Sequence, residues 1–412
     1  MNQEEPIKNA IEKIVNVGGL AGAVTLVWHG DRVVQSTSVG WRDKEARLPM
    51  ERDTVFRIAS MTKPITCAAA LMLFEEGRFA LDEPITRWAP EFTQMRVLRS
   101  PTSPLDQTDQ ADRAITFDDL LTHRSGLTAS GFHAAPIDKA YDETVGSAID
   151  SELPPDKWIA RLATLPLIDQ PGAGFHYGLS TDLLGFLIAR IEGMPLGTLL
   201  SRRIFEPLGM VDTGFTVPKE NQHRRATMYG FDDAGHLTPR PVGLLVSGKG
   251  GMLLSERPDE MAYVSGGQGL WSTADDYLTF ARMFLGDGTV DGVRLLRPET
   301  LTLMTTNRLT DSQRARENMW GLRTFTAHGY GMGVAVVLDP EKAVPTQSRG
   351  GIGTVSWPGA YGGWWQADPT NTSIMIFLTQ NMIELNQFAK GIGLGVYGTI
   401  AHFHKLASAL LH

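Results

Sequence analysis

The chain has 412 residues, of which 42% are hydrophobic and 20% charged, the composition of a globular enzyme with enough length for one large domain or two. Its net charge of −8 offers no attraction to nucleic acid or to an anionic membrane, so neither is expected as a partner. The absence of a low-complexity tract or a fixed-period repeat argues against a solenoid or a propeller.

The chain contains one cysteine and no recognisable export or membrane segment. Cys67 cannot form an intrachain disulfide, and because it lies in a run of small residues we interpret it as a buried hydrophobe. The acidic start is not followed by the apolar core of a signal peptide. No charge-free apolar stretch reaches the length that a transmembrane helix requires. We therefore expect a cytoplasmic protein.

The first forty residues predict a helix followed by a β-hairpin. Apolar residues recur at helical spacing between Ile7 and Val17. A β-rich run from Ala21 to Trp28 is then separated by a short glycine-containing turn from a second run, Arg32 to Val39. The two runs are expected to pair as antiparallel strands.

The tetrapeptide Ser60-Met61-Thr62-Lys63 opens the next segment, which is a long apolar run. Proline is tolerated only in the first turn of a helix, so Pro64 predicts a helix that begins close to Ser60. Residues three apart share a helix face, which directs the Lys63 amine toward the Ser60 hydroxyl. This is the arrangement of a serine nucleophile and its base. The pattern alone also fits a helix cap followed by a solvated lysine.

Helical patterns replace strands for well over a hundred residues after this segment. Thr116 begins a capping-box-like helix start, and two longer helices are predicted from Lys157 to Leu165 and from Thr181 to Ile191. The Pro- and Ser-rich stretch Ser100 to Ala114 is expected to be an exposed loop. A Ser-Thr cap then precedes a further helix, Tyr277 to Leu285.

Strand patterns return near the end of the chain. Four successive strands are predicted: Gly333 to Leu338, Gly353 to Trp357, Gly362 to Asp368 and Ser373 to Thr379. A final helical stretch runs from Gln387 to Leu411. We predict an α+β fold in which both ends of the chain complete one antiparallel sheet. Residues 1–83 and 200–412 would form the sheet domain and residues 84–199 an inserted helical domain, with the active site in the cleft between them.

Other catalytic and cofactor motifs are missing or weak. The chain has no Gly-x-Ser-x-Gly elbow and no metal-ligand cluster, so we predict no metal and no cofactor. Gly393, Gly395 and Gly398 match a dinucleotide fingerprint, but no βαβ unit can follow them, and we interpret them as sites of close helix packing. His402 and His404 are interpreted as an exposed pair.

Two further segments bear on the Ser60 hypothesis. The turn-rich loop from Pro171 to Leu179 leads directly into a helix that Ser180 is expected to cap, which would hold Tyr177 rigidly at the start of that helix. The stretch from Ser356 to Gly363 is a late strand edge at which small residues let backbone approach a ligand closely.

Together these three pieces resemble the serine β-lactamase and penicillin-binding superfamily, and most closely its esterase branch, the family VIII carboxylesterases, which share the class C β-lactamase fold. The resemblance covers nearly the whole chain. Three supporting stretches fit in order and spacing: Leu120 to Leu127, Phe205 to Met210 and Gly266 to Ser272. The implied fold is an antiparallel sheet flanked by helices, with an inserted helical lobe.

The resemblance implies a role for each matching residue. Ser60 would be the nucleophile, Lys63 its partner base, and Tyr177 the group that assists proton transfer. Trp357-Pro358-Gly359 stands where lactamases carry Lys-Thr-Gly. The N–H groups of Ser60 and Ala360 would then form the oxyanion hole. Whether Lys63 or Tyr177 takes the serine proton stays open, because two such groups titrate together.

Two departures from the lactamase pattern point to the substrate. Leu179 stands where lactamases carry an asparagine that contacts the substrate amide, and Trp357 replaces the lysine that recognises the lactam carboxylate. Losing a polar anchor and a cation leaves an apolar cleft suited to neutral esters. His123 is interpreted as structural, bonded to backbone, and His176 is given no role.

The leading hypothesis is a serine carboxylesterase that acts on a small-molecule ester through an acyl-enzyme on Ser60. Acyl transfer to an alcohol or amine on the same fold is an alternative, as is a β-lactamase or D-amino-acid peptidase with weak activity. A degenerate member that binds an ester or cell-wall fragment as a sensor is a non-enzymatic alternative. The cleft walls are expected in three stretches: Ser100 to Ala114, Gly131 to Pro154 and Pro239 to Leu254. These stretches do not indicate which acyl chain or alcohol the enzyme prefers, and the sequence does not indicate the oligomeric state.

Overall fold

The computed structural model describes residues 5–411 apart from eight gaps: 133–135, 147–150, 152, 240–262, 317–324, 345–347, 384–386 and 388–389. Two of the stretches expected to form cleft walls therefore lie partly or almost wholly outside the described residues: Gly131 to Pro154 and Pro239 to Leu254.

An eight-stranded antiparallel sheet joins the two ends of the chain. Its order is β12-β13-β14-β15-β16-β1-β2-β3. The strands are β1 (Gly22–His29), β2 (Arg32–Asp43), β3 (Leu48–Pro49), β12 (His328–Tyr330), β13 (Ala335–Val337), β14 (Val355–Ser356), β15 (Trp364–Asp368) and β16 (Ser373–Leu378). The N-terminal hairpin is joined to the late strands where β1 pairs with β16, Val24 lying opposite Leu378. The prediction of one sheet completed by both termini is confirmed.

The β1–β2 hairpin follows from its turn residues. Gly30 and Asp31 both have positive φ, of 57° and 61°. Two central residues with positive φ match the right-handed twist of the flanking strands, which is why such tight turns favour glycine and aspartate. The expected hairpin is therefore confirmed, and it fixes which residues of β1 face each side of the sheet.

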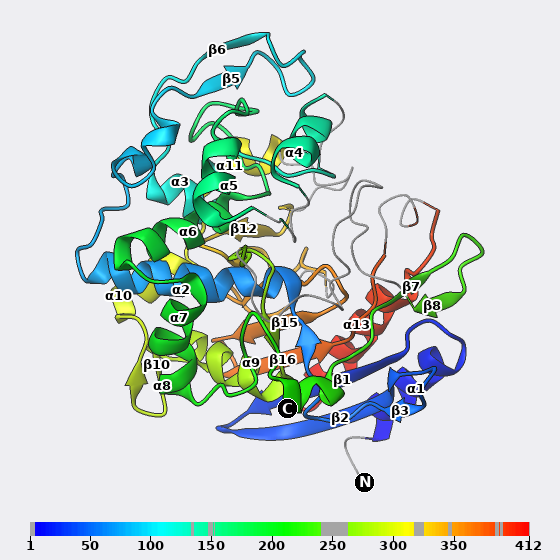
Figure 1. The fold of residues 1–412 in the computed structure, drawn as a ribbon. Helices are drawn as coiled ribbons and strands as arrows, with labels where there is room; N and C mark the ends of the chain where they lie inside the picture. The colour runs from blue at the N-terminus through cyan, green and yellow to red at the C-terminus, as the bar shows by residue number, and fades with distance from the viewer. Residues whose placement is uncertain are drawn as a thin grey trace.

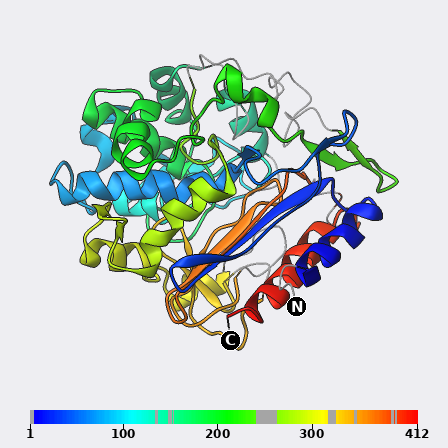
Figure 2. The ribbon, with the colours of Figure 1, turned by 90° about the horizontal axis from the view of Figure 1, so that it is seen from below.

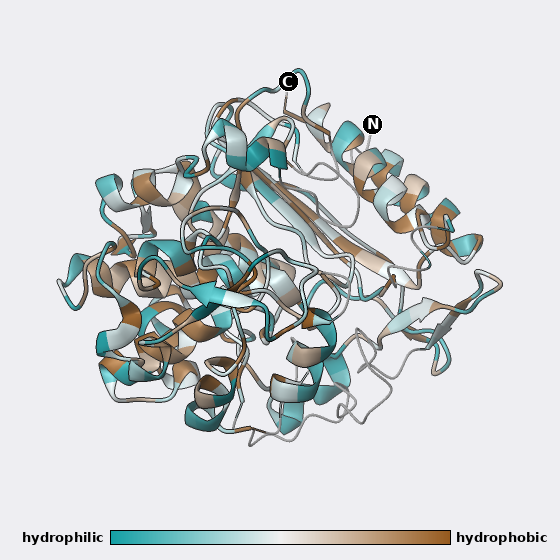
Figure 3. Ribbon diagram, turned by 90° about the horizontal axis from the view of Figure 1, so that it is seen from above, coloured by the Kyte–Doolittle hydropathy of each residue, from teal (hydrophilic) through white to brown (hydrophobic). Residues whose placement is uncertain are grey.

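Each face of the sheet is covered by its own helices. Residues alternate along a strand, so Trp364, Met375 and Phe377 face one side, whereas their neighbours Trp365 and Ile376 face the other. The first face packs against α1 (Glu5–Asn16) and α13 (Gly395–Ser408), which lie side by side in Figure 2. In Figure 3, α1 alternates between hydrophobic and hydrophilic residues, as expected for a helix that buries one face.

The second face packs against α9 (Ala274–Ala281) and the body of the helical region. Tyr277 of α9 lies edge-on to Trp365 of β15, with 5.4 Å between ring centroids. Beyond it, α2 (Thr62–Glu75) packs against α6 (Ser180–Glu192), as Figure 1 shows. The main core includes Ile65 of α2 and Leu183 of α6, so it extends through both of the predicted domains. The boundaries proposed for those domains remain a prediction.

Shorter elements complete the helical region. They are α3 (Phe117–Leu121), α4 (Ile137–Val145), α5 (Pro155–Leu162), α7 (Leu196–Leu200), α8 (Glu206–Leu208), α10 (Pro298–Thr305) and α11 (Asp311–Arg316). Thr116 and Asp119 form the expected capping box at α3, and Thr273 caps α9 through the N–H of Asp276. Both helix starts were predicted correctly because a cap is a local interaction.

Three local expectations were wrong. The region expected to lack strands contains the pair β5 (Arg96–Leu98) and β6 (Thr108–Gln110), each too short to show a period. Ser180 does not cap α6, since Leu179 is the N-cap and the Ser180 hydroxyl bonds to that of Ser125 at 2.8 Å. His404 is buried, and its ring nitrogen lies 2.6 Å from the Arg349 carbonyl oxygen, so it does not form an exposed pair with His402.

Three more short strand pairs lie outside the main sheet. They are β4 (Phe56–Arg57) with β9 (Trp271–Ser272), β7 (Tyr229–Phe231) with β8 (Leu237–Pro239), and β10 (Thr289–Val290) with β11 (Val293–Arg294). Across the described residues, no single helix has the length and hydropathy needed to cross a bilayer. In the same part of the chain, α6 together with the Leu196–Leu208 stretch meets that requirement as a pair, and the two parts are bent by 79°.

Candidate active site

Ser60 lies in a short 3-10 turn between β4 and α2. This turn, Ala59–Met61, reverses the chain immediately after the β4–β9 pair. Ala59 has φ of +45°, a left-handed conformation that is strained for a residue with a side chain. The turn places Ser60 two residues before the start of α2, which has Pro64 in its first turn, as predicted. The serine is 6% exposed, so it is almost fully buried.

Lys63 is buried and its amine reaches the serine. Its side chain is 1% exposed, and Nζ donates hydrogen bonds to Ser60 Oγ at 3.3 Å and to the Gly267 carbonyl at 2.9 Å. The three-residue spacing in the sequence predicted the first contact. The second comes from a distant loop, and the sequence offered no signal for it beyond the paired glycines of Gly266-Gly267.

Tyr177 completes the contacts around the serine hydroxyl. Its O–H donates to Ser60 Oγ at 2.9 Å, and the Lys63 amine lies 4.5 Å from the centre of its ring. A cation at that distance over an aromatic face is attracted by the ring electrons. The Ser60 oxygen therefore has two neighbours, an amine and a phenol, that can each accept or supply a proton.

The loop that carries Tyr177 is held by backbone contacts on both sides. The N–H of His176 donates to the His123 carbonyl at 2.7 Å, and the N–H of Leu179 donates to the Thr128 carbonyl at 3.2 Å. At Gly178, an added Cβ would lie 2.3 Å from the Thr128 backbone, so only glycine lets the two segments approach. The expected rigid placement of Tyr177 comes from these contacts.

Trp357 donates a hydrogen bond to the tyrosine. Its Nε1–H reaches the Tyr177 hydroxyl oxygen at 3.0 Å, and its ring lies 5.3 Å from that of Tyr177 and 5.0 Å from that of Tyr330. Trp357 is 5% exposed. The sequence predicted Trp357 in the site but did not predict this hydrogen bond, because a tryptophan ring is also common in apolar cores.

His123 lies beside Tyr177 without touching the serine. The two rings are 4.8 Å apart, and His123 Nε2 bonds to the Thr181 hydroxyl at 3.3 Å. Burial, with a smaller contribution from the Lys63 charge, holds the pKa of His123 well below its ordinary value. It is therefore neutral at physiological pH. A structural role was predicted, but its side chain bonds to a hydroxyl, not to backbone.

His176 points to a carboxylate outside the catalytic contacts. Its Nε2 lies 3.0 Å from Asp169 Oδ2. Burial tends to raise the pKa of Asp169, but the net shift is downward, because the His176 contact, the Gln170 N–H and the Arg316 charge together outweigh burial. The pair holds the loop in place, and no catalytic role was given to His176.

The strand edge after Trp357 lies against the serine turn. An added Cβ on Gly359 would meet the Ile58 carbonyl oxygen at 2.6 Å, and one on Gly363 would meet Met61 Sδ at 3.0 Å. These glycines allow the edge to close on residues adjacent to Ser60. Within the described part of the chain, no hydrogen bond uses the backbone N–H of Ser60 or of Ala360. The role of these two groups as an oxyanion hole stays a prediction.

Leu179, unlike the polar site residues, belongs to the main apolar core. It is 2% exposed and forms the N-cap of α6. The contact of Leu179 with substrate stays a prediction. Hydrogen bonds connect the side chains of the four polar site residues in this order: Lys63, Ser60, Tyr177 and Trp357. In the described ranges, no three His, Cys, Asp or Glu side chains are grouped so that they could hold a metal ion.

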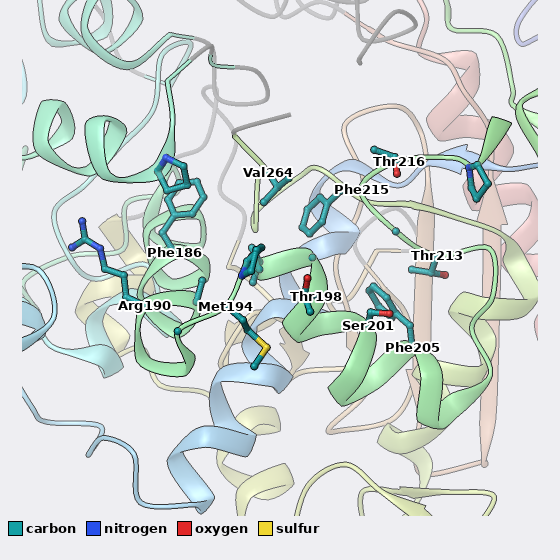
Figure 4. Close-up of a pocket in the computed structure, with 18 of the residues that line it drawn as sticks. Phe186, Arg190, Met194, Thr198, Ser201, Phe205, Thr213, Phe215, Thr216 and Val264 are labelled. Carbon is teal, nitrogen blue, oxygen red and sulfur yellow. The ribbon is translucent and has the colours of Figure 1, made fainter. Parts of the chain in front are cut away.

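A large pocket lies elsewhere in the molecule. It has a volume of about 660 Å³ and lies between the end of α6, α7 and the 211–218 segment (Figure 4). Phe186, Arg190 and Phe215 are among its lining residues, and Ser60, Lys63 and Tyr177 are not. Ser201, which also lines it, donates a hydrogen bond to Glu206 Oε1 at 2.8 Å and is not part of the hydrogen-bonded chain around Ser60. The hydrogen-bonded chain around Ser60, not this hollow, defines the candidate active site.

Known proteins match the chain over almost its full length. Residues 7–392 match the Beta-lactamase family. Protein Rv1367c of Mycobacterium tuberculosis is 46% identical over 377 residues, covering 92% of this chain and 90% of the relative. Esterase EstB of Burkholderia gladioli is 32% identical over 382 residues, covering 89% and 87%. The structure of EstCE1, a hydrolase with promiscuous acyltransferase activity, superposes with a TM-score of 0.78 at 27% identity, covering 96% and 99%.

Proposed function

The chain belongs to the beta-lactamase family, and from that premise we propose that it is a serine carboxylesterase that hydrolyses neutral carboxylic esters through an acyl-enzyme on Ser60. One observation carries the proposal: Ser60 Oγ lies within hydrogen-bonding distance of both the Lys63 amine and the Tyr177 phenol, at 3.3 and 2.9 Å. A serine is a weak nucleophile until a neighbouring base takes its proton.

In the acylation step, the Ser60 oxygen attacks the ester carbonyl carbon. Its proton passes to Lys63 or Tyr177, and the carbonyl oxygen becomes an oxyanion. When the intermediate collapses, the bond to the alcohol oxygen breaks and the alcohol leaves with a proton from the same pair. Both groups touch the serine oxygen, so the geometry is compatible with either as the first acceptor.

In the deacylation step, water attacks the acyl-enzyme. The same pair takes a proton from the water and returns one to the Ser60 oxygen, and the carboxylic acid is released. Trp357 assists both steps, since its N–H donates to the Tyr177 oxygen and so stabilises negative charge there. The N–H groups of Ser60 and Ala360 receive the oxyanion, as their lack of other partners in the described chain supports.

The substrate is proposed to be neutral around its reacting carbonyl. Trp357 places a buried indole where a lactamase carries a cation, and it packs against the apolar ring cluster of Phe175, Phe325 and Tyr330. The described members of this cluster carry no charge that could pair with a carboxylate substituent, and burying an unpaired charge is costly. The esterase activity named for EstB, at 32% identity, supports the same substrate class.

Replacement of the nucleophile tests this function. We expect Ser60→Ala to lower hydrolysis of p-nitrophenyl butyrate by roughly 10³-fold or more, because no acyl-enzyme can form. Ser201→Ala is the matched control, since Ser201 lies in the other pocket and bonds to Glu206. A fluorophosphonate probe should label the wild type and Ser201→Ala but not Ser60→Ala. Full hydrolysis by Ser60→Ala would contradict the proposal.

Acyl transfer is the second candidate function. EstCE1 is a hydrolase with promiscuous acyltransferase activity, and that protein is 27% identical to this chain. Both reactions share the acyl-enzyme and differ only in whether water or another acceptor attacks it. The ratio of acid to transfer ester, measured as the concentration of an added alcohol is varied, separates them. An acid-only product at all concentrations would exclude transfer to that alcohol.

A further inference from the structure

A buried carboxylate lies behind the catalytic lysine. Asp182, on the first turn of α6, is 0% exposed. No Lys, Arg or His of the described residues forms an ion pair with it at contact distance. A buried charge without a direct counter-ion is expensive, and proteins rarely retain one without a role. The contacts of this side chain therefore require an explanation.

One oxygen of Asp182 collects three hydrogen bonds from a single loop. Oδ1 accepts from Ser265 Oγ at 2.5 Å, from Tyr263 O–H at 3.1 Å and from the N–H of Gly267 at 3.3 Å. The other oxygen, Oδ2, is buried without a hydrogen-bond partner in the described residues. An added Cβ on Gly267 would lie 2.5 Å from Oδ2. The loop is thus shaped around the carboxylate, and only glycine fits at that point.

The peptide of Gly267 connects this carboxylate to the lysine. Its N–H points to Asp182, and its carbonyl oxygen accepts from Lys63 Nζ at 2.9 Å. The Lys63 amine in turn donates to Ser60 Oγ at 3.3 Å. A single residue therefore separates Asp182 from the amine. A change at Asp182 can reach Lys63 through two hydrogen bonds and Ser60 through a third.

We propose that Asp182 is a positioning residue for Lys63. Asp182 orients the Gly267 carbonyl and supplies the buried negative charge that balances the lysine amine. The inference rests on the proposed function, because it concerns the base of that reaction. Asp182 touches neither substrate nor the reacting oxygen. It acts by holding the amine at the distance and direction at which it can exchange a proton with Ser60.

Among the described residues, the other titratable groups near Lys63 do not supply this negative charge. Burial holds His123 neutral, its pKa lying well below the ordinary value, and burial raises the pKa of Cys67 to about 12. Tyr177 faces the amine with its ring, and Tyr263 donates to Asp182 itself. Burial raises the pKa of Asp182, and the Lys63 charge opposes that rise, as expected for two groups that stabilise each other's charged form.

Asp182→Asn tests the proposal, because it keeps the size and one acceptor oxygen while it removes the charge. We expect kcat for p-nitrophenyl butyrate, and the rate of fluorophosphonate labelling of Ser60, to fall about tenfold or more with little change in KM. We also expect the acid limb of the kcat/KM profile to move to lower pH by about one unit, since loss of a negative charge favours the uncharged amine.

Asp276→Asn is the matched control. Asp276 is also a buried carboxylate near the start of a helix, but it accepts from the N–H of Asp212 and from Thr213 O–H, both at 2.8 Å, and not from the lysine loop. This variant should leave kcat, labelling rate and pH profile within twofold of the wild type. If Asp182→Asn behaves like Asp276→Asn in all three measurements, the positioning role is wrong.

A second variant keeps the test decisive if Asp182→Asn folds poorly. Ser265→Ala removes one of the donors to Oδ1 but keeps the charge, so labelling should slow while the acid limb stays in place. A wild-type labelling rate in a folded Ser265→Ala enzyme would contradict the proposed linkage through the loop. These outcomes are independent of Ser60→Ala. Active Ser60→Ala would overturn the esterase mechanism, whereas unchanged Asp182→Asn would overturn only the positioning role.

Discussion

Both faces of the central sheet bury polar groups within apolar cores, but the groups differ. Toward α1 and α13, aliphatic and aromatic side chains such as Ile11 and Phe377 share the strand face with the neutral residues Thr25 and Gln35, which are hydrogen-bonded to each other at 2.9 Å. Toward α2 and α6, the core also encloses Lys63 and Asp182, each at most 1% exposed. An apolar core needs only matched shape, whereas buried polar groups need partners with defined geometry. The candidate active-site residues Ser60, Lys63 and Tyr177 belong to the second side, where a buried amine and a buried carboxylate lie close together.

The largest expected effect comes from the side of the sheet that carries Ser60. Tyr177→Phe removes the O–H that reaches Ser60 Oγ at 2.9 Å and accepts from Trp357. We expect kcat/KM for p-nitrophenyl butyrate to fall roughly 10³-fold, equivalent to about 4 kcal/mol of transition-state stabilisation, because the proton route is broken. Thermal unfolding should shift by only a few degrees, about what loss of one or two hydrogen bonds causes. A large loss of stability with retained activity would show that Tyr177 serves the fold and not catalysis.

A substitution in the apolar core between the sheet and α1 should lower stability and leave activity unchanged. Ile11→Ala removes a side chain that is 1% exposed between α1 and the sheet. We expect the free energy of unfolding in urea to fall by about 3 kcal/mol, from lost burial and the cavity left behind. The kcat/KM of the folded enzyme should stay within twofold. Loss of activity below the unfolding transition would show that the two faces are coupled.

The third prediction concerns Asp276, a buried carboxylate on the same side of the sheet as Ser60 that is not part of the candidate active site. Burial raises the pKa of Asp276 from 3.8 to about 6. The folded state then holds its proton more tightly than the unfolded state, so between about pH 4 and 6 this group destabilises the fold increasingly as pH rises. Below about pH 4 both states are protonated and the effect vanishes.

Asp276→Asn should remove this pH-dependent penalty. Relative to the wild type, the variant should gain roughly 3 kcal/mol of unfolding free energy between about pH 4 and pH 7, measured by urea denaturation. Activity should be unaffected. A stability difference that does not change with pH would mean that the hydrogen bonds from Thr213 and Asp212 offset the burial of the charge.

Local features of the chain were predictable because they depend on neighbours in sequence. The β1–β2 hairpin follows from a glycine-containing turn between two β-rich runs, and the α3 capping box follows from Thr116 and Asp119. The strand β12 was missed because His328–Tyr330 is too short and contains a glycine. The cap at α6 was misassigned because Ser180 bonds instead to Ser125, which is 55 residues away in sequence.

The pairing of Ser60 with Lys63 follows from the sequence alone, since helix geometry brings residues three apart onto one face. The resemblance of motifs then supplied Tyr177 and Trp357 as candidates. How these residues meet depends on the tertiary structure. Tyr177 is 117 residues from Ser60, Trp357 is 180 from Tyr177, and the Gly267 carbonyl is 204 from Lys63. The number of residues between two positions does not determine how far apart they lie in space. Contacts between distant segments therefore depend on how the helices and the sheet pack. The linkage from Asp182 to Ser60 is visible only in that packing.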